Sequence, residues 1–156
     1  MPRPEQPMRR FKRSLPMSLL RAREAVMRKF VPSLQQHGLS PQQWRVIRVL
    51  VEQRRLDIGA LARRSSLLAP SLTRIIRNLE GRGIVRRHAV AGDQRRSAIS
   101  ITAQGRALFE RIAPYSEERY RFITERFGQR KLELLYDLLD ELVEKLGEPA
   151  GAPDDS

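Results

Sequence analysis

The chain has 156 residues, 40% of them hydrophobic, which suits one compact domain with terminal arms. Its 30 Lys and Arg against 18 Asp and Glu give a formal net charge of +12, and a chain this basic usually meets a polyanion such as nucleic acid. The absence of cysteine excludes disulfides, thiolate metal sites and cysteine nucleophiles. Two histidines are too few for a structural zinc site, so we predict no metal and no cofactor.

The positive charge is concentrated in the first two thirds of the chain. Residues 1–56 carry thirteen basic and three acidic side chains, residues 57–102 nine and three, and residues 103–156 eight and twelve. The first two segments can therefore face an anion, unless they are only a solvated basic surface. No apolar run approaches the ~18 residues of a membrane span, and no signal peptide is evident, so we expect a cytoplasmic protein without membrane contact.

Helical patterns dominate and are interrupted once by strands. Helices are expected over residues 16–37, 41–53, 58–64 and 70–83, with Ser40 and Asp57 as N-caps of the second and third. The period then changes to two over residues 84–88 and 97–101, which predicts a hairpin with a polar tip at 91–96. A fifth helix begins after Thr102 and a sixth after Gly128.

The sixth predicted helix has the sharpest periodicity in the chain. Its leucines are spaced 3-4-3-4, which is the a/d seam of packed helices. The seam consists of Leu132, Leu135, Leu139, Leu142 and Leu146. It can pack against the fifth helix of the same chain, but its acidic surroundings suit a subunit interface better, with the first, fifth and sixth helices forming a homodimer.

The fourth predicted helix has two contrasting faces. At 100° per residue, Leu68, Leu72, Ile75, Ile76 and Leu79 form an aliphatic face. The opposite side carries arginines, hydroxyls and no acid, as a helix that reads the DNA major groove requires. An ordinary surface helix is the alternative. The candidate DNA-binding residues here are Pro70, Ser71, Thr73, Arg74 and Arg77.

The hairpin tip adds Arg95 and Arg96 as candidate DNA-binding residues. An arginine on a protruding hairpin can enter a narrow minor groove, whose negative potential attracts it. Asp93, two residues earlier, can orient the guanidinium of Arg95 through a bidentate pair. The alternative is a solvated turn.

These segments, in this order, resemble the MarR family of winged-helix regulators over about residues 15–146. The matching pieces are residues 70–76, residues 79–85, Asp93 and Arg95, and residues 99–102 followed by Gly105. The resemblance implies a homodimer on a pseudo-palindromic operator in double-stranded DNA. Such a regulator usually represses and is released by a small ligand, often phenolic.

The first half is similar to regulators of homoprotocatechuate (4-hydroxyphenylacetate) degradation operons. The similarity rests on residues 19–20, 23–25, Met27, Phe30, Pro32, His37 and residues 43–45, and on residues 93–95 of the hairpin. It implies repression of an aromatic-acid catabolic operon and an effector that is a small phenolic or aromatic carboxylate.

The expected fold is therefore mostly α with a small β-hairpin wing: a winged helix-turn-helix plus a helical dimerisation module from both chain ends. We predict a disordered basic arm over residues 1–14 and an N-terminal dimerisation helix over 15–38. The DNA-binding lobe spans 39–102, the C-terminal dimerisation helices span 103–147, and 148–156 form a disordered tail.

Arg23 lies near the middle of the apolar face of the first predicted helix. A buried guanidinium is costly unless an anion satisfies it, so Arg23 is a candidate anchor for the effector's carboxylate. A structural ion pair with an acid of the last two helices or of the other subunit is an equal alternative, and snorkelling to the surface is a third. The other candidate ligand-binding residues are Met27, Phe30, His37, Trp44 and Arg48.

Two other classes of function compete with a regulator. An enzyme is disfavoured because the sequence shows no acid/base constellation, phosphate-binding loop or nucleophile motif, and no catalytic residue is predicted. A sequence-neutral architectural nucleic-acid-binding protein would explain the charge. The aliphatic-backed fourth helix and the separate acidic dimer module argue against it.

Overall fold

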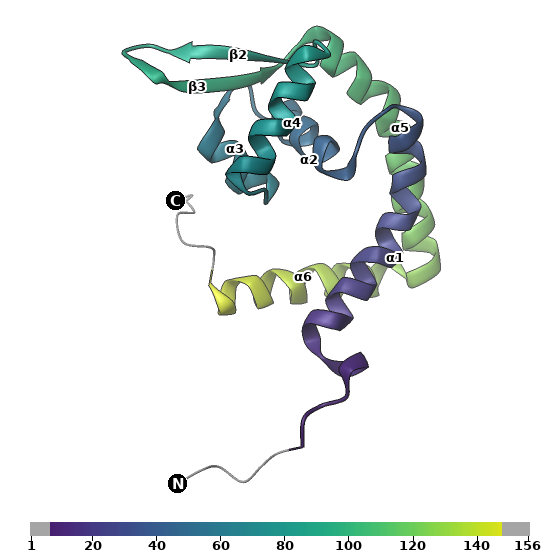
Figure 1. The fold of residues 1–156 in the computed structure, drawn as a ribbon. Coiled ribbons are helices and arrows are strands. Elements are labelled where there is room, and N and C mark those ends of the chain that lie inside the picture. The colour runs from purple at the N-terminus through teal and green to yellow at the C-terminus, as the bar shows by residue number, and fades with distance from the viewer. Residues whose placement is uncertain (1–6, 148–156) are drawn as a thin grey trace, which may run out of the picture.

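A computed structural model describes residues 7–147, apart from the side chains of Gln94 and Arg95. Figure 1 shows a compact lobe at one end of two long helices, with a hairpin projecting from the lobe. In chain order the elements are a 3-10 turn (Phe11–Arg13), α1 (Leu15–Gln36), α2 (Pro41–Glu52), β1 (Leu56–Asp57), α3 (Ile58–Ser65), α4 (Ala69–Gly81), β2 (Val85–Val90), β3 (Asp93–Ile101), α5 (Ala103–Phe127) and α6 (Gln129–Leu146). The predicted mostly-α fold with a wing is confirmed.

The helices begin close to the predicted residues because each N-cap depends on hydrogen bonds between neighbouring residues. The side chain of Ser40 accepts from the Gln43 backbone at 3.1 Å while the Gln43 side chain accepts from the Ser40 backbone at 2.9 Å, a complete capping box. Asp57 accepts from the Ala60 backbone at 2.7 Å and so begins α3. Thr102 accepts from the Gly105 backbone at 3.0 Å at the start of α5.

The sheet has one strand more than the hairpin predicted. β3 lies between β1 and β2 and is antiparallel to both, with Leu56 opposite Ile99 and Val85 opposite Ile101. The sequence analysis missed β1 because two residues are too few to show a period of two. The hairpin strands also extend further toward the tip than predicted, and Gly92 (φ +82°) makes the turn between them.

The core is continuous from the lobe into the adjoining ends of α1 and α5. Its fully buried side chains come from α2, α3, α4 and β3, with Leu34 closing it from α1 and Ile112 from α5. Gly105 lies where α5 meets the start of β2, and a Cβ there would collide with the carbonyl oxygen of Ile84. The first turn of α5 therefore packs directly on the sheet.

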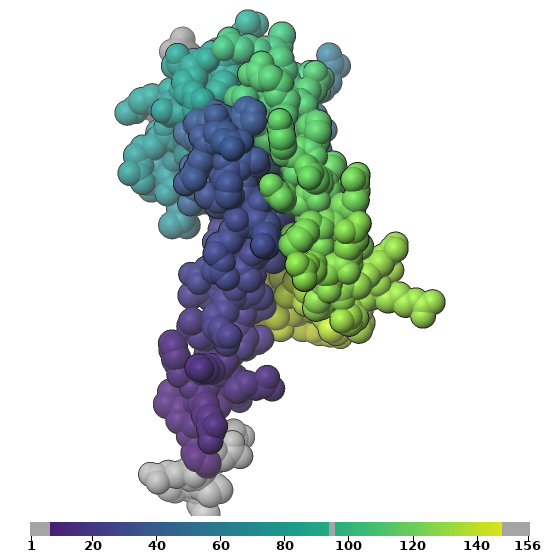
Figure 2. All heavy atoms as spheres, turned by 90° about the vertical axis from the view of Figure 1, so that its right-hand side faces the viewer, coloured from purple at the N-terminus to yellow at the C-terminus, as the bar shows by residue number. Residues whose placement is uncertain are grey.

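The helical part of the molecule buries far fewer of its side chains. α1 and α5 run side by side, and Figure 2 shows the N-terminal part of α1 projecting beyond the end of α5. None of the residues of α6 is buried. Along the predicted seam Leu132, Leu139 and Leu142 are half-buried, while Leu135 and Leu146 are exposed. Packing against α5 therefore does not cover the seam.

Three sequence-based expectations need correction or lie beyond the structure. The arm predicted as disordered over 1–14 contains the 3-10 turn, and Ser14 caps α1 by accepting from the Met17 backbone at 3.4 Å. Leu68, predicted to face the core, is 78% exposed. The tail 148–156 and residues 1–6 lie outside the described residues. Between residues 7 and 147, no helix is long and apolar enough to cross a membrane.

Candidate DNA-binding surface and ligand site

The outer face of α4 presents the predicted cations to solvent. Pro70, Thr73, Arg74 and Arg77 are exposed and Ser71 is half-buried, whereas Leu72, Ile76 and Leu79 fix the opposite face in the core. The Thr73 hydroxyl donates to the Ala69 carbonyl at 2.9 Å. Within residues 7–147 no hydrogen bond or ion pair holds either arginine, so both guanidinium groups are available to an external partner.

α4 is tied to the start of α2. The side-chain nitrogen of Gln43 donates to the side-chain oxygen of Asn78 at 3.0 Å. Beside this bond is an open hollow of about 330 Å³, which Ser71 and Arg74 line together with Ser40. At the same C-terminal end of α4, Arg82 donates to the carbonyl oxygen of Gly38 at 2.9 Å. The C-terminal end of α4 is thus attached to the junction of α1 and α2.

The wing extends beyond the lobe as predicted (Figure 1), and Arg96 is exposed on β3. Arg95 lies outside the described side chains, so its predicted pair with Asp93 stays a prediction. At the base of the hairpin Arg87 forms an ion pair with Glu80 of α4, with 3.5 Å between the Nε and the carboxylate oxygen. This pair links the wing to α4.

A second polar link crosses the sheet. His88 Nδ1 accepts from Arg55 at 3.2 Å, and its Nε2 donates to the Ser100 hydroxyl at 2.7 Å. Desolvation, then the positive charges of Arg55 and Arg86, lower the pKa of His88 below its usual value. A neutral imidazole is what this arrangement needs, because a protonated ring could not accept from a guanidinium.

The candidate ligand residues fall into three groups rather than one cavity. The first group lies between α1, α2 and α5. Phe30 contacts Tyr120 with ring centroids 4.9 Å apart, and Arg48 donates to the Tyr120 hydroxyl at 3.3 Å. An exposed guanidinium therefore sits at the edge of two aromatic rings, one of them buried in α1.

The second group belongs to the packing of the lobe against α5. Trp44 is 8% exposed and stacks on Phe109 at 5.4 Å, so most of its ring is part of the core. His37 ends α1, where its Nδ1 lies 2.8 Å from the Ser33 carbonyl oxygen and its ring is 6.1 Å from that of Tyr115. Both side chains thus have a structural role in this chain.

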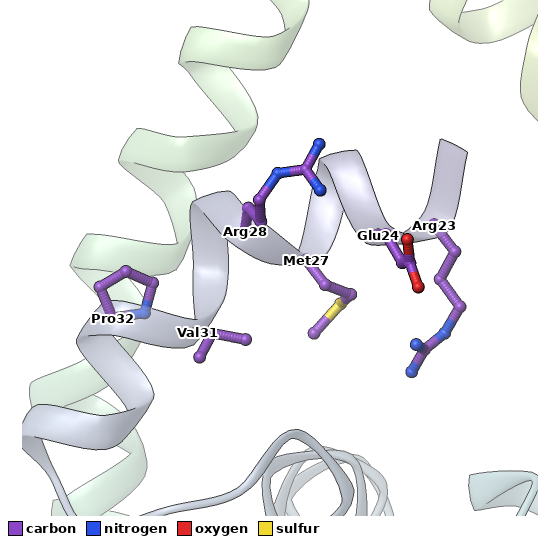
Figure 3. Close-up of a pocket in the computed structure, with 6 residues that line it drawn as sticks. All are labelled: Arg23, Glu24, Met27, Arg28, Val31 and Pro32. Atoms are coloured by element: carbon purple, nitrogen blue, oxygen red, sulfur yellow. The ribbon is translucent and has the colours of Figure 1, made fainter. Parts of the chain in front are cut away.

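The third group lines an open hollow of about 460 Å³ along α1. Figure 3 shows Arg23, Met27 and Val31 projecting from one side of the helix and Arg28 from the other. Arg23 is exposed, which corrects its predicted burial: no residue in the described part of the chain buries its side chain. Among the described residues no carboxylate forms an ion pair with Arg23, which removes the intramolecular alternative there.

Arg23 nevertheless faces another cation. Arg45 of α2 donates to the carbonyl oxygens of Ser65 and Ser66 at 3.1 and 3.4 Å, and its Nε is buried without a partner. Desolvation, then the positive charge of Arg23, lower the pKa of Arg45. The side of α1 that faces the lobe is therefore electropositive, which favours an anion.

The structure adds aromatic residues that the sequence analysis missed. Tyr120, Tyr115 and Phe109 all project from α5 against predicted ligand residues. Nothing in their spacing distinguishes them from ordinary core positions, so only the packing of α5 against α1 and α2 reveals them. Within the described part of the chain, no cluster of His, Asp and Glu could hold a metal ion.

Comparison with known proteins agrees with this geometry. Residues 39–97, from α2 to β3, match the model of the MarR family. The chain is 44% identical to the HTH-type transcriptional regulator FarR of Neisseria gonorrhoeae over 83% of this chain and 88% of FarR. It is 42% identical to the homoprotocatechuate degradative operon repressor of Escherichia coli, with the same coverage. The chain belongs to the MarR family.

The chain is also similar to a solved structure that contains a bound ligand. NadR in complex with 4-hydroxyphenylacetate has 43% sequence identity and a TM-score of 0.74, over 88% of this chain and 97% of that one. This MarR-family chain is accordingly a DNA-binding transcriptional regulator and not an enzyme. The comparisons give no support to a sequence-neutral architectural protein.

Proposed function

We propose that this MarR-family protein is a cytoplasmic homodimeric repressor of an aromatic-acid catabolic operon, released from its operator by a hydroxyphenylacetate-type acid. The observation that carries the proposal is the contact of Arg48 with Tyr120 beside Phe30. In this contact the guanidinium of Arg48 would bind the carboxylate of the ligand, and the two neighbouring rings would contact its aromatic ring. The similarity to NadR with 4-hydroxyphenylacetate and to the homoprotocatechuate operon repressor supports this ligand class.

On the DNA side, Arg74 and Arg77 would read base edges in the major groove, with Thr73, Ser71 and Pro70 against the backbone. The free guanidinium groups and the aliphatic attachment of α4 support this role. Arg95 and Arg96 would follow the minor groove from the wing tip. Substituting Arg95 by Ala should then weaken binding without changing major-groove base preference, because a wing arginine senses groove shape.

On the ligand side, Arg48 would bind the carboxylate beside Phe30, and Arg23 and Met27 would close the site from the separate hollow on α1. Trp44 and His37 would support this site from the packing of the lobe against α5. A carboxylate pairs well with a guanidinium, and the mutual proximity of the positively charged Arg23 and Arg45 supports an anion site here. The exposed side of Arg23 leaves room for a covering residue from the other subunit.

Release would follow from differential affinity. A ligand wedged between α1 and α2 acts on the two elements that Arg82 and Gln43 connect to α4. If it binds better to a dimer whose recognition helices are wrongly spaced, it lowers operator occupancy by that difference in affinity and no more.

The test is calorimetry with 4-hydroxyphenylacetate and 3,4-dihydroxyphenylacetate, alongside operator release in a gel shift. We compare the parent with Arg48→Met and Arg23→Met, and with Arg21→Met as a control on an exposed position of the same helix. The first two variants should bind operator but lose ligand response, and the control should behave as the parent. Unchanged ligand affinity in both site variants would place the effector elsewhere.

A further inference from the structure

Leu68 is the one large apolar side chain in the described part of the DNA-binding lobe (39–102) that is strongly exposed, at 78%. Every other exposed large apolar side chain lies on the N-terminal segment or on α1, α5 or α6. Those positions belong to the surface that a second copy would cover. Leu68 lies far from them along the chain, immediately before the recognition helix.

The turn between α3 and α4 holds Leu68 outward. Ser66 adopts the left-handed conformation (φ +53°), and the Leu67 backbone donates to the Ala62 carbonyl oxygen at 3.0 Å, as in a Schellman ending of α3. That ending turns Leu67 onto the core. Leu68 follows in extended conformation (φ −74°, ψ 145°), so its side chain has left the helical face that continues with Leu72.

Leu68 has no structural role that would explain a leucine. It is the N-cap of α4, a position that Ser, Thr, Asp or Asn stabilise by accepting a backbone hydrogen bond, and its side chain makes no such bond. It is also absent from the core cluster. An apolar side chain that neither caps nor packs is suited to an external contact.

The surroundings of Leu68 identify the partner as an anion. From residue 58 to residue 79 the chain has four arginines and no acid, and all four arginines, in α3 and α4, are exposed. An apolar protein surface would gain nothing from that charge. The DNA major groove satisfies both requirements, because it is flanked by phosphates and carries one apolar group, the C5-methyl of thymine.

We propose that Leu68 is a specificity-determining residue that contacts a thymine methyl group at the entry of α4 into the major groove, once in each half-site. The inference rests on operator binding through α4. Ala69 and Pro70, which are also exposed, extend the same apolar edge. Arginine contacts would select guanine further along α4, and Leu68 would add selection for thymine at a neighbouring step.

The test uses uracil, which differs from thymine only by the missing methyl. The operator is first obtained by selection from random DNA with the full-length protein, and each thymine is then replaced by uracil in both half-sites. Removing one buried methyl should weaken parent binding about fourfold per half-site at one thymine position. Leu68→Ala should bind the thymine and uracil duplexes equally, whereas Leu68→Met, which keeps an apolar side chain of similar size, should retain discrimination.

Leu68 is exposed, so the thermal midpoints of both variants should equal that of the parent. Absence of a methyl effect at every thymine, or discrimination that persists in Leu68→Ala, overturns the inference but leaves the repressor function intact. The inference is also wrong if Leu68→Ala changes self-association while uracil has no effect, because Leu68 then faces another copy. A parent that selects no sequence contradicts the proposed function itself, and this inference with it.

Discussion

The DNA-binding lobe and the helical module use apolar side chains in opposite ways. In the lobe, α2, α3, α4 and β3 each contribute leucines or isoleucines that are completely buried within one chain. In α6 no residue is buried, and Leu134, Leu138 and Val143 are more than half exposed. The lobe therefore completes its hydrophobic core within one chain. The helical module needs a second copy of the chain to exclude water from its leucines.

The largest effect on this difference between the two regions should come from a charge placed in the leucine seam of α6. Leu139→Asp or Leu142→Asp should dissociate the dimer and abolish operator binding, because an unpaired carboxylate in an apolar interface costs several kcal/mol. Sedimentation measures dissociation, a gel shift measures operator binding, and circular dichroism checks that each variant is folded. Gln129→Asp, on an exposed position of the same helix, is the control and should leave the dimer intact. An intact dimer in both seam variants would mean that α6 packs only within its own subunit.

Substitutions in the DNA-binding lobe should reduce the preference for operator DNA and leave the dimer intact. Arg74→Ala and Arg77→Ala should each lose about 1–3 kcal/mol of preference for operator over random DNA. Both side chains are exposed and unpaired, so the fold should not change. Gel shifts in competition with random DNA provide the measurement, and full operator preference in both variants would remove α4 as the reading helix.

Two glycines test how completely the lobe is packed. Gly105→Ala should lower stability by about 1–3 kcal/mol, because the new methyl group meets the Ile84 carbonyl. Gly81→Ala, at the end of α4 with nothing within 4 Å, should be neutral or stabilising by up to about 1 kcal/mol. Thermal unfolding separates the two, and equal midpoints would indicate that α5 is not seated on the sheet as described.

The smallest effect concerns His88 and pH. Its folded pKa is depressed by desolvation and by Arg55 and Arg86, so on acidification the unfolded chain takes up this proton first. The contribution of His88 to stability is present above the unfolded pKa of about 6.5 and declines as pH falls through that value toward the folded pKa. His88→Gln should flatten the fall in thermal midpoint between pH 7.5 and 5.5. A parent midpoint that does not decline across this range would contradict the assignment.

The sequence predicted what depends on local chemistry and periodicity. Capping by Ser40 and Asp57, and the two faces of α4 from Leu72 onward, need only neighbouring residues, and the structure confirms them. Leu68 was misplaced because helical periodicity was extended one residue beyond the helix. The Schellman turn at Ser66, which reverses the direction of the next side chains, leaves no clear sequence mark when the left-handed residue is not glycine.

The candidate ligand site was less predictable because it depends on tertiary contacts between residues far apart in the sequence. Helical periodicity alone placed Arg23 in the middle of an apolar face, yet the described part of the chain leaves its side chain exposed. The partner of Phe30 is Tyr120, 90 positions later in the sequence, and that of Trp44 is Phe109. Such pairs depend on how α5 packs against α1 and α2, and the periodicity of each separate helix does not determine that packing.

One feature joins the two regions: α1 is a continuous helix of 22 residues, about 33 Å long, whose C-terminal end is built into the core at Leu34 while its N-terminal half is uncovered. In the proposed function the same helix contributes to the dimer, the effector site and the lobe, so effector binding and operator binding are thermodynamically linked. If the effector weakens operator binding by some factor, operator DNA must weaken effector binding by the same factor. A promoter-bound dimer would then respond only at higher effector concentrations than a free one, so the threshold for induction depends on how much operator DNA the cell contains.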